Sequence, residues 1–346
     1  MLKLSNINLI IIILAAAQNL FAGLPPNEST NAPECQQLES NIHLEKAIAA
    51  GNYGITLLVD VGGRKEALKV TKGNVDRETK VGLELSELGE SLNIPLYLKN
   101  YSSFKCSCNN LPPSWKSAIK EKQQASGKLG IGNPEDPKTQ SEQCTFIRLE
   151  LLDKSVLDVK RENPDFFRAN PNFVKSLMFQ ILFAYEVAHR ELGFLHCDAN
   201  DDNYGLLCSG KQEGQSCKAN PSESVSTQWC FELDKKVWCF KAQDSQNYYL
   251  KLIDFGQSGT RSKPFSTRTT NKICKTNFRQ DASSTLGLFN GWMRSAGIEA
   301  PDDWETAWNM AQEKNSWAPV LHSSIFANFV NQIPSANKSR FFKINK

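Results

Sequence analysis

The chain contains 346 residues, and 40% of them are hydrophobic, which suits a protein with a folded core. Its 40 basic and 37 acidic residues leave a net charge of only +3, so nothing in the composition indicates a nucleic-acid-binding protein. The sequence also lacks internal repeats and long low-complexity tracts.

The first 22 residues are typical of a cleavable secretory signal peptide. Lys3 precedes a short apolar run over residues 9–17, and small residues follow before position 23. The run is shorter than the roughly 20 apolar residues that span a bilayer, although an uncleaved signal retained as an anchor is the alternative. Residues 23–39 are polar, contain Pro, and are expected to form a leader along the surface.

Ten cysteines follow the expected signal peptide, an even number that predicts disulfides in an oxidising compartment. We expect Cys106 or Cys108 to pair with Cys144, and the four cysteines between residues 208 and 239 to form two bridges. Few histidines accompany the cysteines, so a metal cluster is not expected. Three sequons for N-glycosylation fit the same compartment, at Asn27, Asn100 and Asn337. The full set of cysteines is Cys35, Cys106, Cys108, Cys144, Cys197, Cys208, Cys217, Cys230, Cys239 and Cys274.

The first folded segment opens with a glycine-containing turn and a strand. Gly51 and Gly54 flank two residues, and missing side chains there let backbone N–H groups approach a ligand closely. A strand-like stretch follows and contains Ala67 and Lys69.

A helix is predicted next, because apolar residues keep helical spacing from Val81 to Leu92 and the pattern stops before Pro95. Residues 104–143 are rich in Lys, Gln, Gly and Pro, and we expect an insertion with little regular structure of its own. Another strand is expected over residues 144–152.

The second half of the chain contains the most informative motifs. An amphipathic helix is predicted from Pro171 to about Leu192, and it leads directly into residues 194–207. A cysteine-rich insertion over about 208–247 is expected to form a small surface excursion. Further helices are expected around residues 304–313 and 319–331.

His196, Asp198 and Asn203, followed downstream by Asp254-Phe255-Gly256, resemble the catalytic loop and the metal-binding motif of the protein-kinase superfamily. Asp281 resembles the buried aspartate at the start of a central helix in that family. The resemblance covers about residues 46–290.

The resemblance implies an α+β, bilobal fold with disulfide-rich insertions. A small β-rich N-lobe would comprise residues 40–152, and a larger helical C-lobe would comprise residues 153–346.

It also implies roles for four side chains. Asp198 would orient the attacking hydroxyl and accept its proton, while Asn203 and Asp254 would bind Mg²⁺ or Mn²⁺. Lys69 occupies the place of the lysine that contacts the α- and β-phosphates of ATP.

The remaining ATP-binding positions follow from the same resemblance. Gly51 and Gly54 would form a degenerate glycine-rich loop over the phosphates, and Ala67 would lie over the base. Backbone groups near Glu150 and Leu152 would bond adenine.

The family also holds its lysine with a glutamate from the following helix. Glu84 is the residue we expect to pair with Lys69, and Glu87 is the alternative; for either, a charge on a solvated helix face remains the competing interpretation.

Three departures from the family pattern leave the substrate class open. Asn200 replaces the catalytic-loop lysine and Asp202 occupies the offset that tyrosine kinases use, so the loop supplies no basic side chain. Cys197 replaces the arginine that docks a phosphorylated activation loop, which implies constitutive activity. No Ala-Pro-Glu occurs between Gly256 and Asp281.

The signal peptide, the cysteine-rich insertions and this motif set are together similar to the divergent kinases of the secretory pathway. We expect a secreted or luminal ATP-dependent kinase that phosphorylates Ser/Thr of secretory-pathway proteins, with no stable membrane span after signal cleavage. A glycan or small-molecule kinase and an inactive pseudokinase serving as a binding module are the alternatives. Retention of Lys69, Asp198, Asn203 and Asp254 together favours an enzyme.

Residues 257–280 contain six basic and no acidic side chains. This run predicts acidic or already phosphorylated acceptors, and a solvated loop is the competing interpretation.

Overall fold

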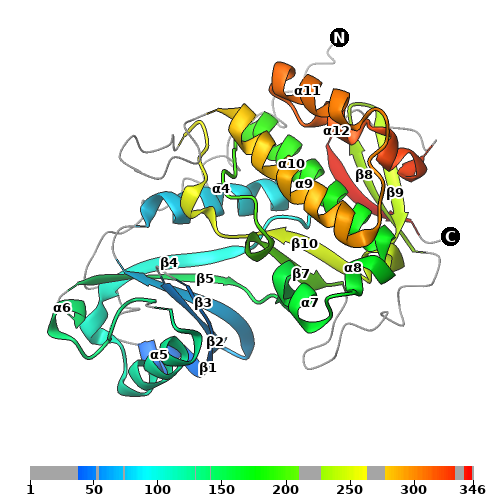
Figure 1. The fold of residues 1–346 in the computed structure, drawn as a ribbon. Coiled ribbons are helices and arrows are strands. Elements are labelled where there is room, and N and C mark those ends of the chain that lie inside the picture. Colours follow the sequence, from blue (N-terminus) through cyan, green and yellow to red (C-terminus); the bar gives the residue numbers. More distant parts are fainter. Residues whose placement is uncertain are drawn as a thin grey trace, which may run out of the picture.

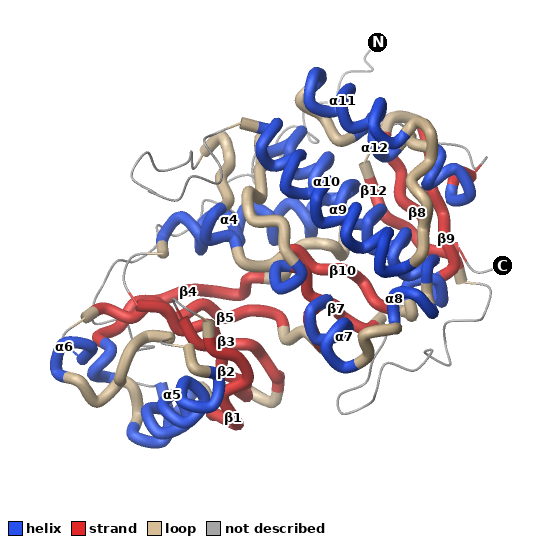
Figure 2. Tube along the Cα trace, viewed as in Figure 1, coloured by secondary structure: helices blue, strands red, loops and turns tan. Residues whose placement is uncertain are grey.

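The computed structural model describes residues 38–344, apart from residues 52–53, 73–74, 129, 141, 210–226, 263–276 and 332–338. This part of the chain is a mixed α+β structure with three antiparallel sheets (Figures 1 and 2). The expected signal peptide, most of the leader, most of the basic run and the sequons at Asn27 and Asn337 lie outside the described residues, as do Cys35, Cys217 and Cys274.

A five-stranded antiparallel sheet forms the N-terminal part, with strand order β1-β2-β3-β5-β4. The strands are β1 (His43–Ala50), β2 (Gly54–Val61), β3 (Arg64–Lys72), β4 (Asn100–Ser107) and β5 (Gln143–Glu150). The short helix α3 (Leu38–Asn41) precedes them. Gly62 and Gly63 close the β2–β3 hairpin with φ of 62° and 85°, a turn that glycine adopts without steric cost.

Helix α4 (Asp76–Leu92) follows β3, as the apolar spacing predicted. It ends at Asn93, which adopts the left-handed conformation with φ of 53°, and Pro95 prevents its continuation. Gly82 lets the helix approach a distant ring closely, since a Cβ atom there would lie 3.4 Å from Phe255. The helix is thereby packed against the segment that follows Asp254.

The first insertion is more regular than expected. Strand β4 extends to Ser107 and is followed by a 3₁₀ turn (Cys108–Asn110), by helix α5 (Pro113–Ser126) and by α6 (Pro137–Gln140). Trp115 and Ile119 of α5 are buried in the core of the five-stranded sheet. The expectation of little regular structure is wrong because α5 is amphipathic, with Trp115 and Ile119 buried and polar residues such as Lys120 and Gln124 exposed.

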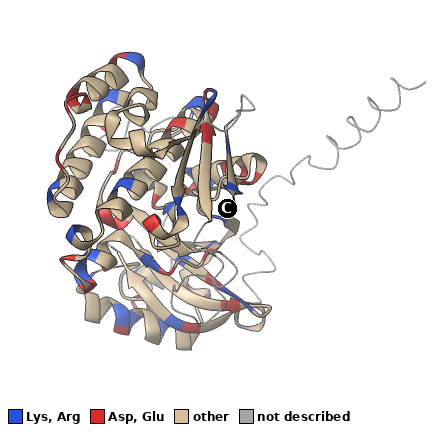
Figure 3. Cartoon of the chain, turned by 90° about the vertical axis from the view of Figure 1, so that its right-hand side faces the viewer, with Lys and Arg blue, Asp and Glu red and all other residues tan. Residues whose placement is uncertain are grey.

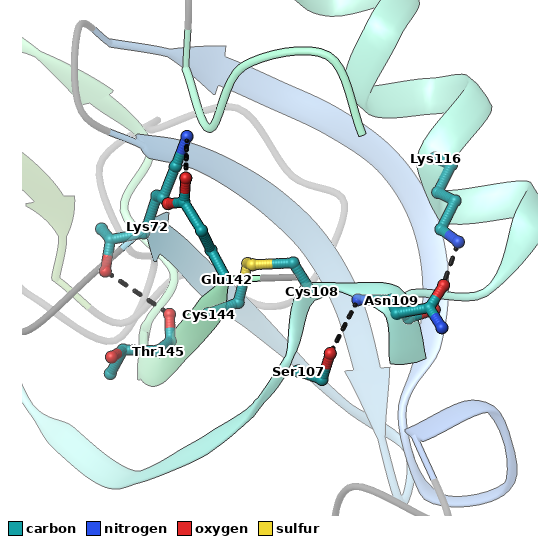
Figure 4. Close-up of a disulfide and its surroundings, with 9 residues drawn as sticks. Lys72, Ser107, Cys108, Asn109, Lys116, Glu142, Cys144 and Thr145 are labelled. Atoms are coloured by element: carbon teal, nitrogen blue, oxygen red, sulfur yellow. Dashed lines mark hydrogen bonds and ion pairs between the residues drawn. A yellow bond between two sulfur atoms is a disulfide. The ribbon is translucent and has the colours of Figure 1, made fainter. Parts of the chain in front are cut away.

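A disulfide joins Cys108 to Cys144 at the base of this insertion, which decides between the two expected pairings (Figure 4). Cys106 lies directly across from Cys144 in the β4–β5 register, yet Cys106 belongs to another disulfide. An ion pair between Lys72 and Glu142 lies beside the bridge at 2.8 Å.

The second part of the chain is built around α9, which is buried along most of its length. Its bounds, Pro171–Leu192, match the prediction, with Pro171 at the first turn and Gly193 as a left-handed cap. A helix that is apolar on all sides must be enclosed, and α10 (Phe278–Ala296), α12 (Ala318–Leu321) and strands surround it. The other helices are α7 (Val156–Glu162), α8 (Phe166–Ala169) and α11 (Trp304–Lys314).

The described residues of the second insertion belong to the core. Strands β8 (Gln228–Leu233) and β9 (Lys236–Lys241) form a hairpin, joined at its edges by β11 (Val330–Asn331) and β12 (Arg340–Ile344). The rings of Phe231 and Trp238 are fully buried against Phe179 of α9. The expected surface excursion is therefore wrong for this hairpin, because its aromatic residues fill the space beside α9.

One further expectation needs correction. The helix expected over residues 319–331 is only the short α12, followed by a 3₁₀ segment (Ser324–Phe329) and β11. At the sequon of Asn100, which stays a prediction, the residue is half-buried, its amide oxygen is buried and its amide nitrogen lies close to Gly82.

Disulfide formation is confirmed more widely. Cys230 pairs with Cys239 across the β8–β9 hairpin, and Cys197 and Cys208 are also disulfide-bonded.

No helix in the described part of the chain is both long and apolar enough to cross a membrane. Basic and acidic residues are interspersed along the described chain, in line with the nearly balanced charge (Figure 3).

Candidate active site

The two sequence motifs meet at the end of a small three-stranded sheet. It consists of β6 (Lys154–Ser155), β7 (Tyr204–Cys208) and β10 (Tyr248–Leu252), with β7 in the centre. Asn203 immediately precedes β7, and Asp254 follows β10, which runs antiparallel to β7. The backbone N–H of Ile253 donates to the carbonyl of Asn203 at 3.2 Å, so the two motifs are adjacent.

Asp281 anchors the loop that carries Asp198. Its two carboxylate oxygens accept hydrogen bonds from the backbone N–H groups of His196 and Cys197, each at 2.9 Å. Burial raises the pKa of the Asp281 carboxyl, although these donors and His196 act in the opposite direction. Asp281 lies near the start of α10, so the expected buried aspartate is confirmed as a geometric feature.

The same loop is also fixed to the segment around Asp254. The His196 ring contacts the carbonyl of Ile253 at 3.1 Å, and Ser258 donates to the carbonyl of His196 at 3.0 Å. Cys197 and Asp254 both adopt left-handed backbone conformations, with φ of 66° and 57°. Such conformations are unfavourable for residues with a side chain and persist where the surroundings impose them, commonly at functional sites.

The carboxylate of Asp198 is held by two amides. Asn203 donates to Oδ2 at 2.9 Å, and Asn200 donates to Oδ1 at 3.1 Å. Because the amide nitrogen of Asn203 is used in this way, its amide oxygen is the atom left to bind a cation. The arrangement orients Asp198 as an acceptor without placing a positive charge beside it.

Lys69 lies between two carboxylates. Its Nζ atom is 2.5 Å from Glu78 and 3.5 Å from Asp254. Burial opposes the charged form, but the attraction of both carboxylates raises the pKa of Lys69 above its usual range. Burial likewise acts to raise the pKa of Asp254, yet the Lys69 ammonium and the Gly256 amide lower it overall. Lys69 is therefore a fixed ammonium group beside the ionised carboxylate of Asp254.

Glu78 therefore takes the place that the sequence assigned to Glu84. Glu84 lies further along α4 and instead accepts hydrogen bonds from Thr260, at 2.8 Å, and from Ser262. Glu87 is exposed. The first turn of α4 faces β3, where Glu78 meets Lys69, and Arg77 of the same turn donates to the carbonyl of Gly256 at 2.5 Å.

The glycine turn is shaped by close backbone contacts. Gly51 donates to the carbonyl of Gly54 at 2.9 Å, and the residues between them lie outside the described part. A Cβ atom on Gly54 would lie 2.8 Å from the carbonyl oxygen of Val70, so only glycine fits there.

The segment after β5 is braced by a buried lysine. Ala67 of β3 pairs with Leu149, and Glu150 forms an ion pair with Lys251 at 2.8 Å. The backbone N–H of Glu150 donates to the carbonyl of Lys99 at 2.9 Å, so this group is not free to bond a base. The side chain of Leu152 packs over Gly205, where a Cβ atom would collide with it.

The donor set at Asn203 and Asp254 fits Mg²⁺ or Mn²⁺. Both offer hard oxygen ligands, and the Asp254 side chain is 50% exposed, which leaves its carboxylate accessible. Within the described residues, no group of three or more His, Cys, Asp or Glu side chains is arranged to hold a metal ion. A cation at this place would need further oxygen atoms from a ligand.

A scan of the chain against protein-family models gives no match, and no curated protein matches it significantly in sequence. The functional assignment therefore depends on the geometry of the site.

Two residues of the site, Glu78 and Lys251, were not identified from the sequence. Acidic residues such as Glu78 are common in the first turn of a helix, so it gave no distinctive signal. Lys251 is the one basic residue of strand β10, which was not expected to be part of the site.

Proposed function

We propose that the protein is an ATP-dependent phosphotransferase with a bilobal, protein-kinase-like arrangement. The observation that carries the proposal is the contact of Lys69 with both Glu78 and Asp254, residues from three separate elements. A half-buried ammonium held between a helix glutamate and the aspartate of the Asp-Phe-Gly motif is the arrangement that orients nucleotide phosphates in kinases. In this proposal residues 40–152 form the N-lobe and residues 153–346 the C-lobe.

Each site residue then has a role in phosphoryl transfer. Lys69 contacts the α- and β-phosphates of ATP, and the glycine turn from Gly51 to Gly54 lies over them. Asn203 and Asp254 would hold a Mg²⁺ or Mn²⁺ ion, which would supply the positive charge that neutralises the phosphates. Ala67 and the backbone around Leu152 bind the base; the occupied N–H of Glu150 leaves only its carbonyl for adenine.

Asp198 serves as the base. The acceptor oxygen attacks the γ-phosphorus, the bond from phosphorus to the bridging oxygen breaks, and ADP leaves with that electron pair. The proton of the acceptor hydroxyl passes to Asp198, whose free lone pairs are oriented by the amides of Asn200 and Asn203.

The substrates proposed are Ser/Thr hydroxyls of proteins in the secretory pathway. The disulfides support folding in an oxidising compartment, which is the secreted or luminal location that the sequence predicts.

The test is to purify the secreted protein and to compare wild type, Asp254→Asn and Asp198→Asn. Wild type should gain thermal stability with ATP and Mg²⁺ or Mn²⁺ and should transfer labelled phosphate to proteins of a secretory extract. Asp254→Asn should lose both properties, and Asp198→Asn should lose only transfer. Binding without transfer to protein, glycan or small-molecule acceptors would indicate a pseudokinase, and no nucleotide-dependent shift with any divalent cation would refute the proposal.

A further inference from the structure

A buried lysine contacts the segment proposed to bind the base. Lys251 of β10 stands between the fully buried Leu250 and Leu252, and its own side chain is only 3% exposed. Its ammonium lies 2.8 Å from the carboxylate of Glu150 and donates to the carbonyl of Tyr97 at 3.3 Å. The proposed phosphoryl transfer assigns no role to this side chain.

Glu150 is held from two sides. Its backbone N–H donates to the carbonyl of Lys99 at 2.9 Å, and its carboxylate accepts from the N–H of Lys99 at 3.4 Å. The segment between α4 and β4 is also attached to β10 directly, because the N–H of Leu252 donates to the carbonyl of Leu96 at 3.0 Å. The Lys251 ammonium therefore joins three segments: the end of β5, the connection from α4 to β4, and β10.

The residues after Glu150 rest on the strand partner of Lys251. In the β7–β10 ladder Lys251 pairs with Gly205, and the side chain of Leu152 fills the space over this glycine, where a Cβ atom would lie 2.2 Å from it. The N–H of Asp153 then donates to the carbonyl of Leu206 at 2.9 Å. The proposed base-binding segment is thus attached at three points to the sheet that ends at the proposed metal ligands.

Stability alone does not account for a buried ion pair such as Lys251–Glu150. Taking two charges out of water offsets much of their attraction, so apolar side chains of similar volume often give equal or greater stability. Apolar contacts are not directional, however. Hydrogen bonds between charged groups are directional, and they fix the position of one segment relative to another.

We propose that Lys251 is a positioning residue for nucleotide binding. Acting through Glu150, it holds residues 150–152 at the distance from Asp254 that a nucleotide requires between its base and its phosphates. Lys251 precedes Asp254 by three residues, so the base-binding segment and the phosphate end of the site are located by one stretch of backbone. The inference rests on the proposed phosphotransferase function and gives Lys251 no contact with the nucleotide.

The test measures the Kd of ATP with Mg²⁺ by isothermal titration calorimetry. Lys251→Met leaves the Glu150 carboxylate without its ammonium, so the variant should lose stability and its Kd should rise about 3–10-fold, the effect of misplacing one hydrogen bond to a ligand. The double variant Lys251→Met with Glu150→Leu removes both charges. It should regain most of the melting temperature, while its Kd should stay raised, and it carries the test if the single variant does not fold.

Two controls separate positioning from a structural role. Arg340→Met removes the ion pair of the fully buried Glu232, in a sheet that contains no site residue, and should lower the melting temperature without changing the Kd of ATP. A smaller folded fraction reduces the measured stoichiometry rather than the affinity. Inorganic tripolyphosphate with Mg²⁺ has no base, so its Kd should be equal in wild type and in the double variant.

The outcomes distinguish this inference from the proposed function. A double variant that binds ATP as tightly as wild type would overturn the inference, and so would equal losses for ATP and tripolyphosphate; either result leaves the phosphotransferase proposal intact. Absence of ATP binding in the wild type with any divalent cation would overturn both.

Discussion

The ammonium of Lys69 lies 2.5 Å from the carboxylate of Glu78 in the first turn of α4. This contact joins β3 to the helix, and through Arg77 and Gly256 the same turn is joined to the segment after Asp254. A change in the position of α4 would therefore move Lys69 relative to Asp254.

The first prediction concerns this pair. Glu78→Gln removes the charge that holds Lys69, and a hydrogen bond between charged groups contributes about 1.5–3 kcal/mol, so kcat/KM for ATP should fall roughly 10- to 150-fold. Glu84→Gln is the matched control, since Glu84 accepts hydrogen bonds from the hydroxyl groups of Thr260 and Ser262 and makes no contact with Lys69 among the described residues, and it should change kcat/KM much less. A larger loss in the control would return Glu84 to the role that the sequence suggested.

The second prediction concerns Asp281, which anchors the loop that carries Asp198. Asp281→Ala leaves the buried N–H groups of His196 and Cys197 without acceptors, at about 1–3 kcal/mol each, so the free energy of unfolding should fall by about 2–6 kcal/mol. Asp281→Asn keeps one acceptor oxygen and should lose less. Urea denaturation of both variants measures these losses in the free energy of unfolding. An Asp281→Asn variant as unstable as Asp281→Ala would contradict the prediction.

The third prediction compares two disulfides by the length of chain that each closes. Cys108–Cys144 spans 36 positions and Cys230–Cys239 spans 9. Closing the longer loop restricts the unfolded chain more, so the double serine variant of the first pair should be less stable by about 1 kcal/mol than that of the second. Melting temperatures in the opposite order would show that native packing around the hairpin outweighs chain entropy.

The fourth prediction is a pH dependence at His322. Burial and the neighbouring Lys236 lower the pKa of this imidazole below 6.5, and it packs edge-on against Trp238. The folded state therefore binds its proton less readily than the unfolded state, so stability is complete above about pH 6.5 and decreases as the pH falls below it. His322→Gln should flatten the fall in melting temperature between pH 7 and 5, whereas an unchanged slope would assign the effect to other groups.

The sequence by itself determined the elements whose signals are local. Apolar spacing located α4 and α9, because a helix that buries one face or all faces must repeat its apolar residues with the helical period. The resemblance carried by Asp198, Asn203 and Asp254 singled out two loops, and the structure shows that these loops are adjacent.

Only the tertiary structure decided which distant groups meet. From the sequence, Glu84 or Glu87 was expected to pair with Lys69, whereas the structure places Glu78 there. The position of α4 depends on its contacts with Phe255 and Gly256, which no local sequence pattern indicates. The insertions were misjudged for a related reason. Trp115 and Phe231 appear in polar, cysteine-rich sequence, but burial is a property of what packs against a residue, and their partners in the sheet core and on α9 lie far away in the chain.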